Sequence, residues 1–347
     1  WCGWLPQLGA EKRRDGLGVG RESIRAGRDR RGISRYAVRY PCGSFRHIWR
    51  YRNQILCTDS ILGLTHGNPI GSSAMLGQLR MDYSSYSGIA RPGKGSAPFI
   101  GQINFNPGDQ NAHLIFLAPE SNLMDRALLA LLDHLSWESG GRGALRLLAE
   151  ISEDESAFEM LRLSGFSVYG RQQVWRFVNL PHNGDKNHLW RSFQQIDQHN
   201  LNNLYHAVVP PLVQGSEAMD KRPVQGYVHY VDSELLAFVE VTNGPKGIFL
   251  TPVMHPNIRE PENLMADLLR LMNSSNGRPL YLAVRDYQSW LNSAAESLGG
   301  TPGNRKIMLV KHLINKQRVS VPATIRKVLE AHGTETTSPI VHNATKE

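Results

Sequence analysis

The chain has few of the residues that build a cross-linked, metal-binding or membrane-spanning protein. Its 347 residues include three cysteines, Cys2, Cys42 and Cys57. This odd number, crowded near the start, excludes a disulfide scaffold and a paired-cysteine redox motif. No apolar run approaches the roughly 20 residues of a membrane-spanning helix, so we expect no membrane partner. The histidines lack the spacing of a metal site, and no metal is expected.

Acidic residues are scarce in the first part of the chain. Residues 1–52 hold 13 Lys or Arg and 4 Asp or Glu, whereas the rest holds 26 and 27. The formal charge of +8 therefore belongs to the leading segment. Because this segment has many Gly and Arg but few periodic apolar residues, residues 1–50 are expected to form a basic, disordered arm. Two alternatives stay open: a misassigned chain start, or an arm that binds nucleic acid or acidic lipid.

The charge balance and the start of the chain also bear on partners and location. Beyond the arm the charges nearly cancel, so nucleic acid is an expected partner only of the arm. The twin arginines Arg13-Arg14 are not followed by an apolar segment, as an export signal would require. We therefore expect a cytoplasmic protein.

Loop-forming residues divide the rest of the chain. The polar stretch Leu180–Asn187, which contains Pro and Gly, lies near the middle and predicts a domain boundary. We expect a first domain over residues 51–180 and a second over 188–316. Residues 317–347 are expected to be a C-terminal extension that ends in a frayed tail. Gly88–Pro98, with two prolines and three glycines, is expected to be a loop.

Hydrophobic periodicity predicts the same order of elements in both halves. In the first half we expect strands at Phe99–Phe105 and Ala112–Ala118, a long helix capped by Ser121, a strand at Leu145–Ile151, a short helix at Asp154–Ser164 and a strand at Gln173–Val178. In the second half we expect strands at Leu235–Val241 and Gly247–Val253, a helix from Pro261, a strand at Leu280–Arg285, a helix at Tyr287–Leu298 and a strand at Lys306–Lys311. Helical leaders are expected at 48–64 and 190–208.

Residue matches support two copies of one α/β domain. Asn122-Leu123-Met124 matches Asn263-Leu264-Met265 at the two long helices. Gly165 and Gly299 stop the two short helices. Matches at nearly constant offset indicate an internal repeat.

The element order, and the ending Leu-Arg-Leu-Ser-Gly-Phe at Leu161–Phe166, resemble the GNAT-type N-acyltransferase superfamily over about residues 60–315. The resemblance implies an α/β fold (an α+β mixed sheet) in two tandem GNAT-like domains. In that family a central strand splays from its neighbour, and acyl-CoA lies in the gap. The long helix that follows points its N-terminus at the pyrophosphate, where free N–H groups favour an anion.

The resemblance implies acetyl-CoA or another acyl-CoA as co-substrate, held around the two long-helix starts. The implied binding residues are Leu117, Ala118, Leu123, Met124, Asp125 and Arg126 in the first copy and Val253, Arg259 and Asn263 in the second. The chain departs from the family's phosphate-binding motif. Leu123 and Asp125 stand where glycines belong, and Glu120 stands where Gln or Arg belongs. A carboxylate about 4 Å from a phosphate costs roughly 4 kcal/mol at an effective dielectric near 20.

The resemblance also implies acid–base residues on the central strands. The candidates are His113 and Glu240 as base and Tyr169 as acid, because Leu161 and Ala295 stand where the family often has a tyrosine. The alternative for His113 is a surface histidine. The alternative for Glu240 is an outward-facing carboxylate beside inward-facing Val239 and Val241.

Two functions remain open at this level. One is acyl-CoA-dependent transfer of an acetyl or acyl group to the amine of a small molecule or peptide. The other is a catalytically degenerate pair of GNAT-like domains that binds a ligand or a protein. Fold does not decide between them.

Overall fold

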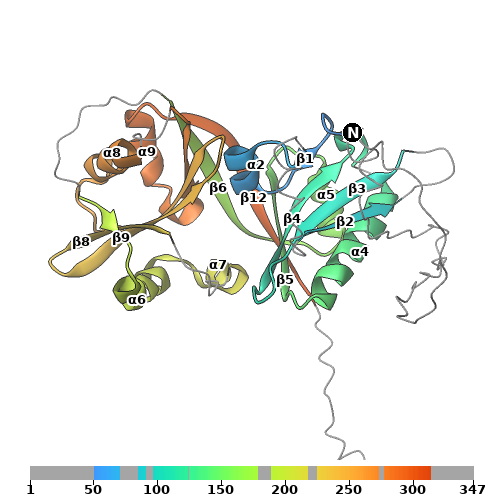
Figure 1. Cartoon of the computed structure of the whole chain (residues 1–347), viewed down its shortest axis with the longest axis horizontal. Helices are drawn as coiled ribbons and strands as arrows, with labels where there is room; N and C mark the ends of the chain where they lie inside the picture. The colour runs from blue at the N-terminus through green and yellow to red at the C-terminus, as the bar shows by residue number, and fades with distance from the viewer. Residues whose placement is uncertain are drawn as a thin grey trace, which may run out of the picture.

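A computed structural model of the chain describes residues 51–70, 85–90, 97–123, 125–178, 189–217, 225–272 and 277–313. The described strands form one twelve-stranded sheet in the order β2-β3-β4-β5-β12-β6-β11-β10-β9-β8-β7, with the short β1 paired to β4 (Figure 1). None of the helices in these ranges is long and apolar enough to cross a bilayer.

The first half contributes six strands and the helices that flank them. Its elements are β1 (Leu56–Cys57), α2 (Ser60–His66), β2 (Ser85–Ala90), β3 (Phe99–Asn104), β4 (Asn111–Ala118), α4 (Arg126–Gly141), β5 (Arg146–Ser152), α5 (Ala157–Leu163) and β6 (Ser167–Phe177). The second half has β7 (Arg191–Ser192), α6 (Gln198–Val208), α7 (Pro211–Ser216), β8 (Gly226–Val231), β9 (Glu234–Asn243), β10 (Ile248–Met254), α8 (Pro261–Met272), β11 (Leu280–Arg285), α9 (Leu291–Ser297) and β12 (Thr301–His312).

The two halves repeat one arrangement of strands, which confirms the expected mixed α/β fold in two copies. In the first half β4 is antiparallel to β3 and parallel to β5. In the second half β10 is antiparallel to β9 and parallel to β11. Each parallel pairing extends over three residues and then stops, so β4 and β5, and likewise β10 and β11, part toward their C-terminal ends.

The last strand of the chain joins the sheet of the first half, a feature that the sequence did not reveal. β12 lies between β5 and β6 and pairs antiparallel with both. β6 in turn pairs with β11 of the second half. The halves therefore exchange strands and share one continuous sheet (Figure 1).

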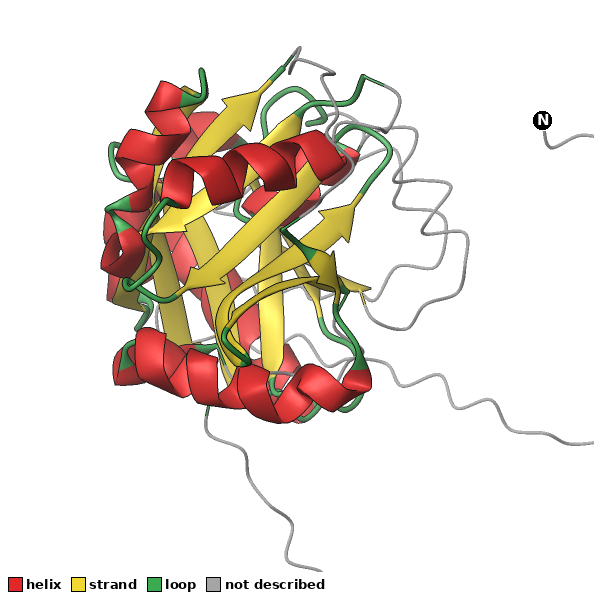
Figure 2. Ribbon diagram, turned by 90° about the vertical axis from the view of Figure 1, so that its left-hand side faces the viewer, coloured by secondary structure: helices red, strands yellow, loops and turns green. Residues whose placement is uncertain are grey.

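Helices cover both faces of this sheet (Figure 2). On one face α4 and α5 pack over the first half, and α8 and α9 pack over the second. On the other face Leu64 of α2 packs against Val174, Phe249 and Ala283. On the same face Leu204 of α6 and Val213 of α7 belong to the core that includes Tyr169 and Met308. The leading helical segments of the two halves thus pack on the same face of the sheet.

Three expectations need correction at the level of single elements. Gly88 lies in β2, a strand, because Gly88 pairs with Gly101 and α4 packs closely on both: a Cβ at Gly88 would lie 3.0 Å from the side chains of Leu131 and Leu135. The long helix α4 is capped by Asp125, whose Oδ1 accepts from the Ala127 N–H at 2.7 Å, and not by Ser121.

The third correction concerns the repeated Asn-Leu-Met sequence. Asn122 ends a 3-10 turn before α4, whereas Asn263 lies in the first turn of α8. The two triplets are therefore not equivalent in the structure. The glycine stops do correspond, because Gly165 and Gly299 have positive φ angles of 95° and 78° just after α5 and α9.

Candidate functional site

A cavity of about 160 Å³ lies over the centre of the sheet, where the two halves meet. Its walls come from both halves: β4, β5 and β6, then β9 to β12, with the start of α2 and the residue after α7. All three acid–base candidates line it: His113 from β4, Tyr169 from β6 and Glu240 from β9. The strand exchange therefore brings together residues that are distant in sequence.

Carboxylates dominate the charged lining of this cavity. Asp59, Glu150, Glu217 and Glu240 face two basic side chains, His113 and Arg285. Glu240 lies on the opposite side of β9 from Val239 and Val241, which belong to the core under α8 and α9. Glu240 therefore faces away from the core that contains Val239 and Val241, as the alternative in the sequence analysis stated. It faces the cavity and not the outer surface.

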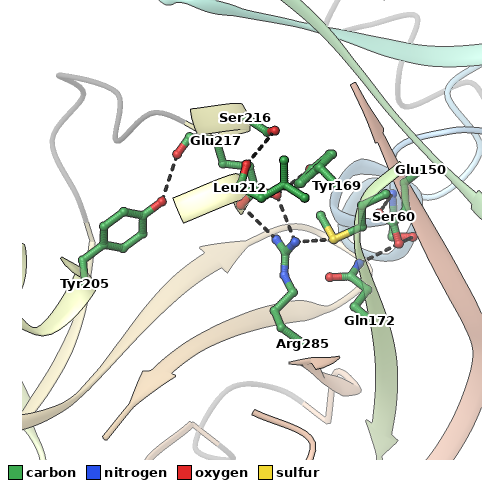
Figure 3. A network of polar contacts seen from close by, with 10 residues as sticks. Ser60, Glu150, Tyr169, Gln172, Tyr205, Leu212, Ser216, Glu217 and Arg285 are labelled. Atoms are coloured by element: carbon green, nitrogen blue, oxygen red, sulfur yellow. Dashed lines mark hydrogen bonds and ion pairs between the residues drawn. The ribbon is translucent and has the colours of Figure 1, made fainter. Parts of the chain in front are cut away.

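Arg285 at the end of β11 is neutralised by Glu217 (Figure 3). Its two terminal nitrogens donate to Glu217 at 2.9 Å and 3.3 Å. Tyr169 donates its hydroxyl to the same carboxylate at 2.5 Å. Burial opposes the charge of Arg285, but Glu217 holds its pKa above the ordinary value. Burial and the adjacent Glu217 raise the pKa of Tyr169 well above its usual value, so this phenol stays protonated.

Glu150 occupies a second polar cluster on the cavity wall (Figure 3). Its Oε1 accepts from the Ser60 hydroxyl at 2.7 Å and from the Gln172 amide at 2.6 Å. Burial raises the pKa of Glu150, and these two hydrogen bonds only partly offset the shift.

His113 and Asp59 form the more exposed side of the cavity. The His113 Nδ1 lies 4.0 Å from Asp59 Oδ2, and 48% of the histidine side chain is accessible. Asp59 also caps α2, because its Oδ1 accepts from the Leu62 N–H at 2.9 Å. Among the described residues, no three His, Cys, Asp or Glu side chains are grouped to hold a metal ion.

The gap between β4 and β5 is filled by the chain itself. Leu56 and Cys57 pair antiparallel with Leu117 and Phe116 of β4. The next residue, Thr58, donates its N–H to Ile115 at 2.9 Å and its hydroxyl to Leu114 at 2.7 Å. On the other side the Glu150 N–H of β5 donates to the Thr58 carbonyl at 2.9 Å. The segment Leu56–Thr58 thus bridges the two parted strands by main-chain hydrogen bonds.

At the corresponding gap between β10 and β11, one side chain bonds to the parted end of β10. Gln288, which is fully buried, donates its amide to the Pro252 carbonyl at 2.9 Å. Its carbonyl accepts from the Met254 N–H at 2.7 Å. The Pro252 carbonyl and the Met254 N–H are therefore satisfied within the chain.

The expected phosphate-binding residues do not form an open cradle. Leu117, Ala118, Leu123 and Val253 are buried in the core. Asp125, Arg126, Arg259 and Asn263 are exposed, and Met124 lies outside the described residues. Asp125 already occupies the Ala127 N–H at the start of α4, and Asn263 donates to Glu260 at 2.6 Å at the start of α8.

These contacts decide whether acyl-CoA fits the residues present. A pantetheine chain between β4 and β5 would compete with Leu56–Thr58 for the same main-chain groups. At the second gap it would compete with Gln288. At both helix starts a phosphate would meet carboxylates. Acyl-CoA does not fit the site in this arrangement.

Sequence reasoning missed Glu150, Glu217, Arg285 and Gln288. Glu150 and Arg285 lie in predicted strands, Gln288 lies in a predicted helix and Glu217 lies in none, and no local pattern sets them apart. One signal was available: Gln172 and Glu150 are polar residues within buried strands, which is uncommon without a partner.

Comparisons with solved structures agree with this fold. The chain is similar to a GCN5-related N-acetyltransferase from Sphaerobacter thermophilus, with a TM-score of 0.50 and 11% identity over 80% of this chain and 95% of that one. It is also similar to a tandem GNAT protein from the clavulanic acid biosynthesis pathway, with a TM-score of 0.46 and 12% identity over 80% of this chain and 98% of that one. The first likeness shows the GNAT fold and nothing beyond the fold. No family model and no curated protein matches the chain.

Proposed function

We propose that this chain uses the GNAT fold to bind a small protonated amine in the central cavity, and that it does not transfer an acyl group. One observation carries the proposal: Leu56–Thr58 lies between β4 and β5 and bonds to both strands. The place that an acyl donor needs is part of the folded core. A GNAT fold that has no place for the acyl donor can still bind a ligand in its central cavity.

The cavity supports an amine because its charge is one-sided. Glu217 and Arg285 neutralise each other at 2.9 Å. Asp59, Glu150 and Glu240 add three more carboxylates to the described lining, against one further basic side chain, His113. Carboxylates in a partly enclosed site stabilise a nearby cation more strongly than in water. The volume of about 160 Å³ is below the roughly 300–1,000 Å³ of drug-sized pockets, so the ligand is small or is the amine end of a larger molecule.

The side chains that line the cavity have different roles in binding the amine. Asp59 and Glu240 supply acceptors for the ammonium group, and Glu150 does so once it is ionised. Tyr169 is held by Glu217 and shapes the wall. Because the raised pKa of Glu150 lets it take up a proton above its usual range, binding of a cation weakens on acidification through that range.

Thermal shift with a matched pair of probes tests this proposal. Butylamine should raise the melting temperature, whereas butan-1-ol, which has nearly the same shape without the charge, should not. Glu240→Gln should abolish most of the shift, and Glu234→Gln, at the exposed start of the same strand, should retain it. Equal shifts by the amine and the alcohol would contradict an amine site.

The second candidate function is acyl-CoA-dependent transfer to an amine, which is favoured by the presence of His113, Tyr169 and Glu240 in one cavity. This function requires the segment Leu56–Thr58 to move out of the gap between β4 and β5. The test is transfer of a radiolabelled acetyl group from acetyl-CoA to butylamine. Transfer that is lost in His113→Ala and kept in Glu234→Gln would establish this function and overturn the first.

A further inference from the structure

A second pocket, independent of the central cavity, lies on the other side of α2. It has a volume of about 540 Å³ and is lined by α2 on one side and by β6, β11 and β12 on the other. This volume falls within the range of about 300–1,000 Å³ that is typical of small-molecule sites.

An irregularity in β12 opens this pocket. The pairing of β12 with β6 shifts between Pro302 and Arg305, so Gly303 and Asn304 have no register partner in β6. Such bulges bend a strand away from its neighbour and redirect side chains. On β6 the register places Arg176 between Tyr281 of β11 and Thr301 of β12. These three residues all line the pocket.

The pocket is basic, in contrast to the acidic central cavity. Arg176 and Lys306 line it, and none of its described lining residues is Asp or Glu. Within the described part of the chain, Arg176 is exposed and makes no ion pair or hydrogen bond. Lys306 donates only to the Ser152 hydroxyl, at 2.9 Å, among those same residues. Neither cation therefore forms an ion pair among the described residues, although Lys306 lies near enough to Glu155 to offset part of the raised pKa of that carboxyl.

The rest of the lining is largely apolar and carries no negative charge. Leu64 of α2 and Val174 of β6 form one apolar surface, beside the half-buried ring of Tyr281. Cys57 is a neutral thiol, because burial raises its pKa to about 11. Lys306 pairs with Gln172 and Arg176 with Thr301, so the two cations stand at separate positions along the lining, and Val174 of the apolar surface lies between them.

From this geometry we infer that the pocket between α2 and β6, β11 and β12 binds an organic anion: an apolar or aromatic body that carries a carboxylate, sulfonate or phosphate group. Arg176 offers a planar pair of donors to such a group, and Lys306 adds a point charge. The inference does not rest on the proposed amine site, because no residue that carries it lines the central cavity.

Two fluorescent probes that differ by one charged group test the inference on the full chain. 8-Anilinonaphthalene-1-sulfonate carries an aromatic body and a sulfonate, and N-phenyl-1-naphthylamine is the same skeleton without the sulfonate. The sulfonate probe should bind in a saturable manner and at least about tenfold more tightly than the neutral one. Equal affinities would overturn the inference, because apolar burial alone would then account for binding.

Variants locate the site. Arg176→Met and Lys306→Met should each weaken sulfonate binding by about tenfold and leave the neutral probe unchanged. Arg171→Met is the matched control on β6, because Arg171 pairs with Glu153 and does not line the pocket. If Arg176→Met binds the sulfonate as tightly as the unmodified chain, the inference is wrong. A melting temperature unchanged by Arg176→Met excludes an effect through unfolding.

Discussion

At the level of residues, a small number of polar side chains decide what the fold can hold. The sequence resemblance identified His113, Tyr169 and Glu240, and all three line the central cavity. It did not identify their neighbours Glu217 and Arg285. Glu217 follows α7, which packs on β6, and Arg285 ends β11, which pairs with β6. No spacing along the chain encodes that pairing, so the cavity could not be predicted from local patterns.

Gln288 is expected to be structural, because its side chain satisfies two buried main-chain groups of β10. Gln288→Ala leaves the Met254 N–H and the Pro252 carbonyl without partners. The free energy of unfolding should fall by about 2–4 kcal/mol, measured by urea denaturation. Gln198→Ala, which removes a side chain bonded to Asn202 on the surface of α6, should change it by less than about 0.5 kcal/mol. A similar small effect at Gln288 would mean that the second gap is open to solvent.

Glu150 should make the free energy of unfolding depend on pH, and Glu150→Gln should remove this dependence. Its pKa is raised by burial in the folded state, so the folded state holds its proton at pH values where the unfolded state has lost it. Stability therefore falls as pH rises from about 4.5 through the folded pKa. Near pH 4 the Glu150→Gln variant should have the same free energy of unfolding as the unmodified chain. Toward pH 8 the variant should become the more stable of the two.

Urea unfolding of the two proteins across this range measures the difference at each pH. The matched control is Glu153→Gln, an exposed carboxylate that pairs with Arg171. The difference in free energy of unfolding between Glu153→Gln and the unmodified chain should not vary with pH as it does for Glu150→Gln. A constant or reversed difference at Glu150 would show that this group is not penalised by burial.

At the level of elements, strongly periodic segments were predicted well and short or extended ones were not. The helix from Pro261 and the strand Leu280–Arg285 agree with α8 and β11. β6 and β12 begin several residues earlier than expected. The first part of β12 is exposed although it pairs, and the first part of β6 mixes exposed Ser167 and Arg171 with buried Tyr169 and Gln172. β1 was not anticipated, since a two-residue strand has no periodicity; only its two pairing partners define it.

The segment before α2 should be needed for stability, whereas the basic arm should not. A chain that begins at Tyr51 is expected to keep its melting temperature. A chain that begins at Ser60 lacks Leu56 and Thr58, both buried, and the main-chain bonds between β4 and β5. Its melting temperature should fall by about 10 °C or more. If both shortened chains melt like the full chain, Leu56–Thr58 does not hold the two strands together.

At the level of the whole molecule, the exchange of strands makes the proposed halves, 51–180 and 188–316, dependent on each other. β5 and β6 meet only through β12, which comes from the other end of the chain. Without β12 both strands would present unpaired main-chain edges next to a hydrophobic core. The internal repeat is visible in the sequence, but the exchange is not, because both arrangements bury the same apolar faces.

This dependence predicts that residues 51–178 do not fold alone. The fragment should show no cooperative thermal transition by circular dichroism. Mixing it with a separately produced fragment 189–313 should restore one transition, because β12 is then supplied. The control is the full chain cleaved between residues 178 and 189, which should melt as one unit. Cooperative folding of 51–178 by itself would mean that the exchange is not required.

The central claim is that the chain's own residues occupy the place of the acyl donor. Calorimetric titration of the full chain with acetyl-CoA tests it most directly. We predict no saturable heat, corresponding to a dissociation constant weaker than about 1 mM, because Leu56–Thr58 bonds to both β4 and β5 and Gln288 bonds to the parted end of β10. Saturable binding with a dissociation constant of about 10 μM or below would contradict the claim.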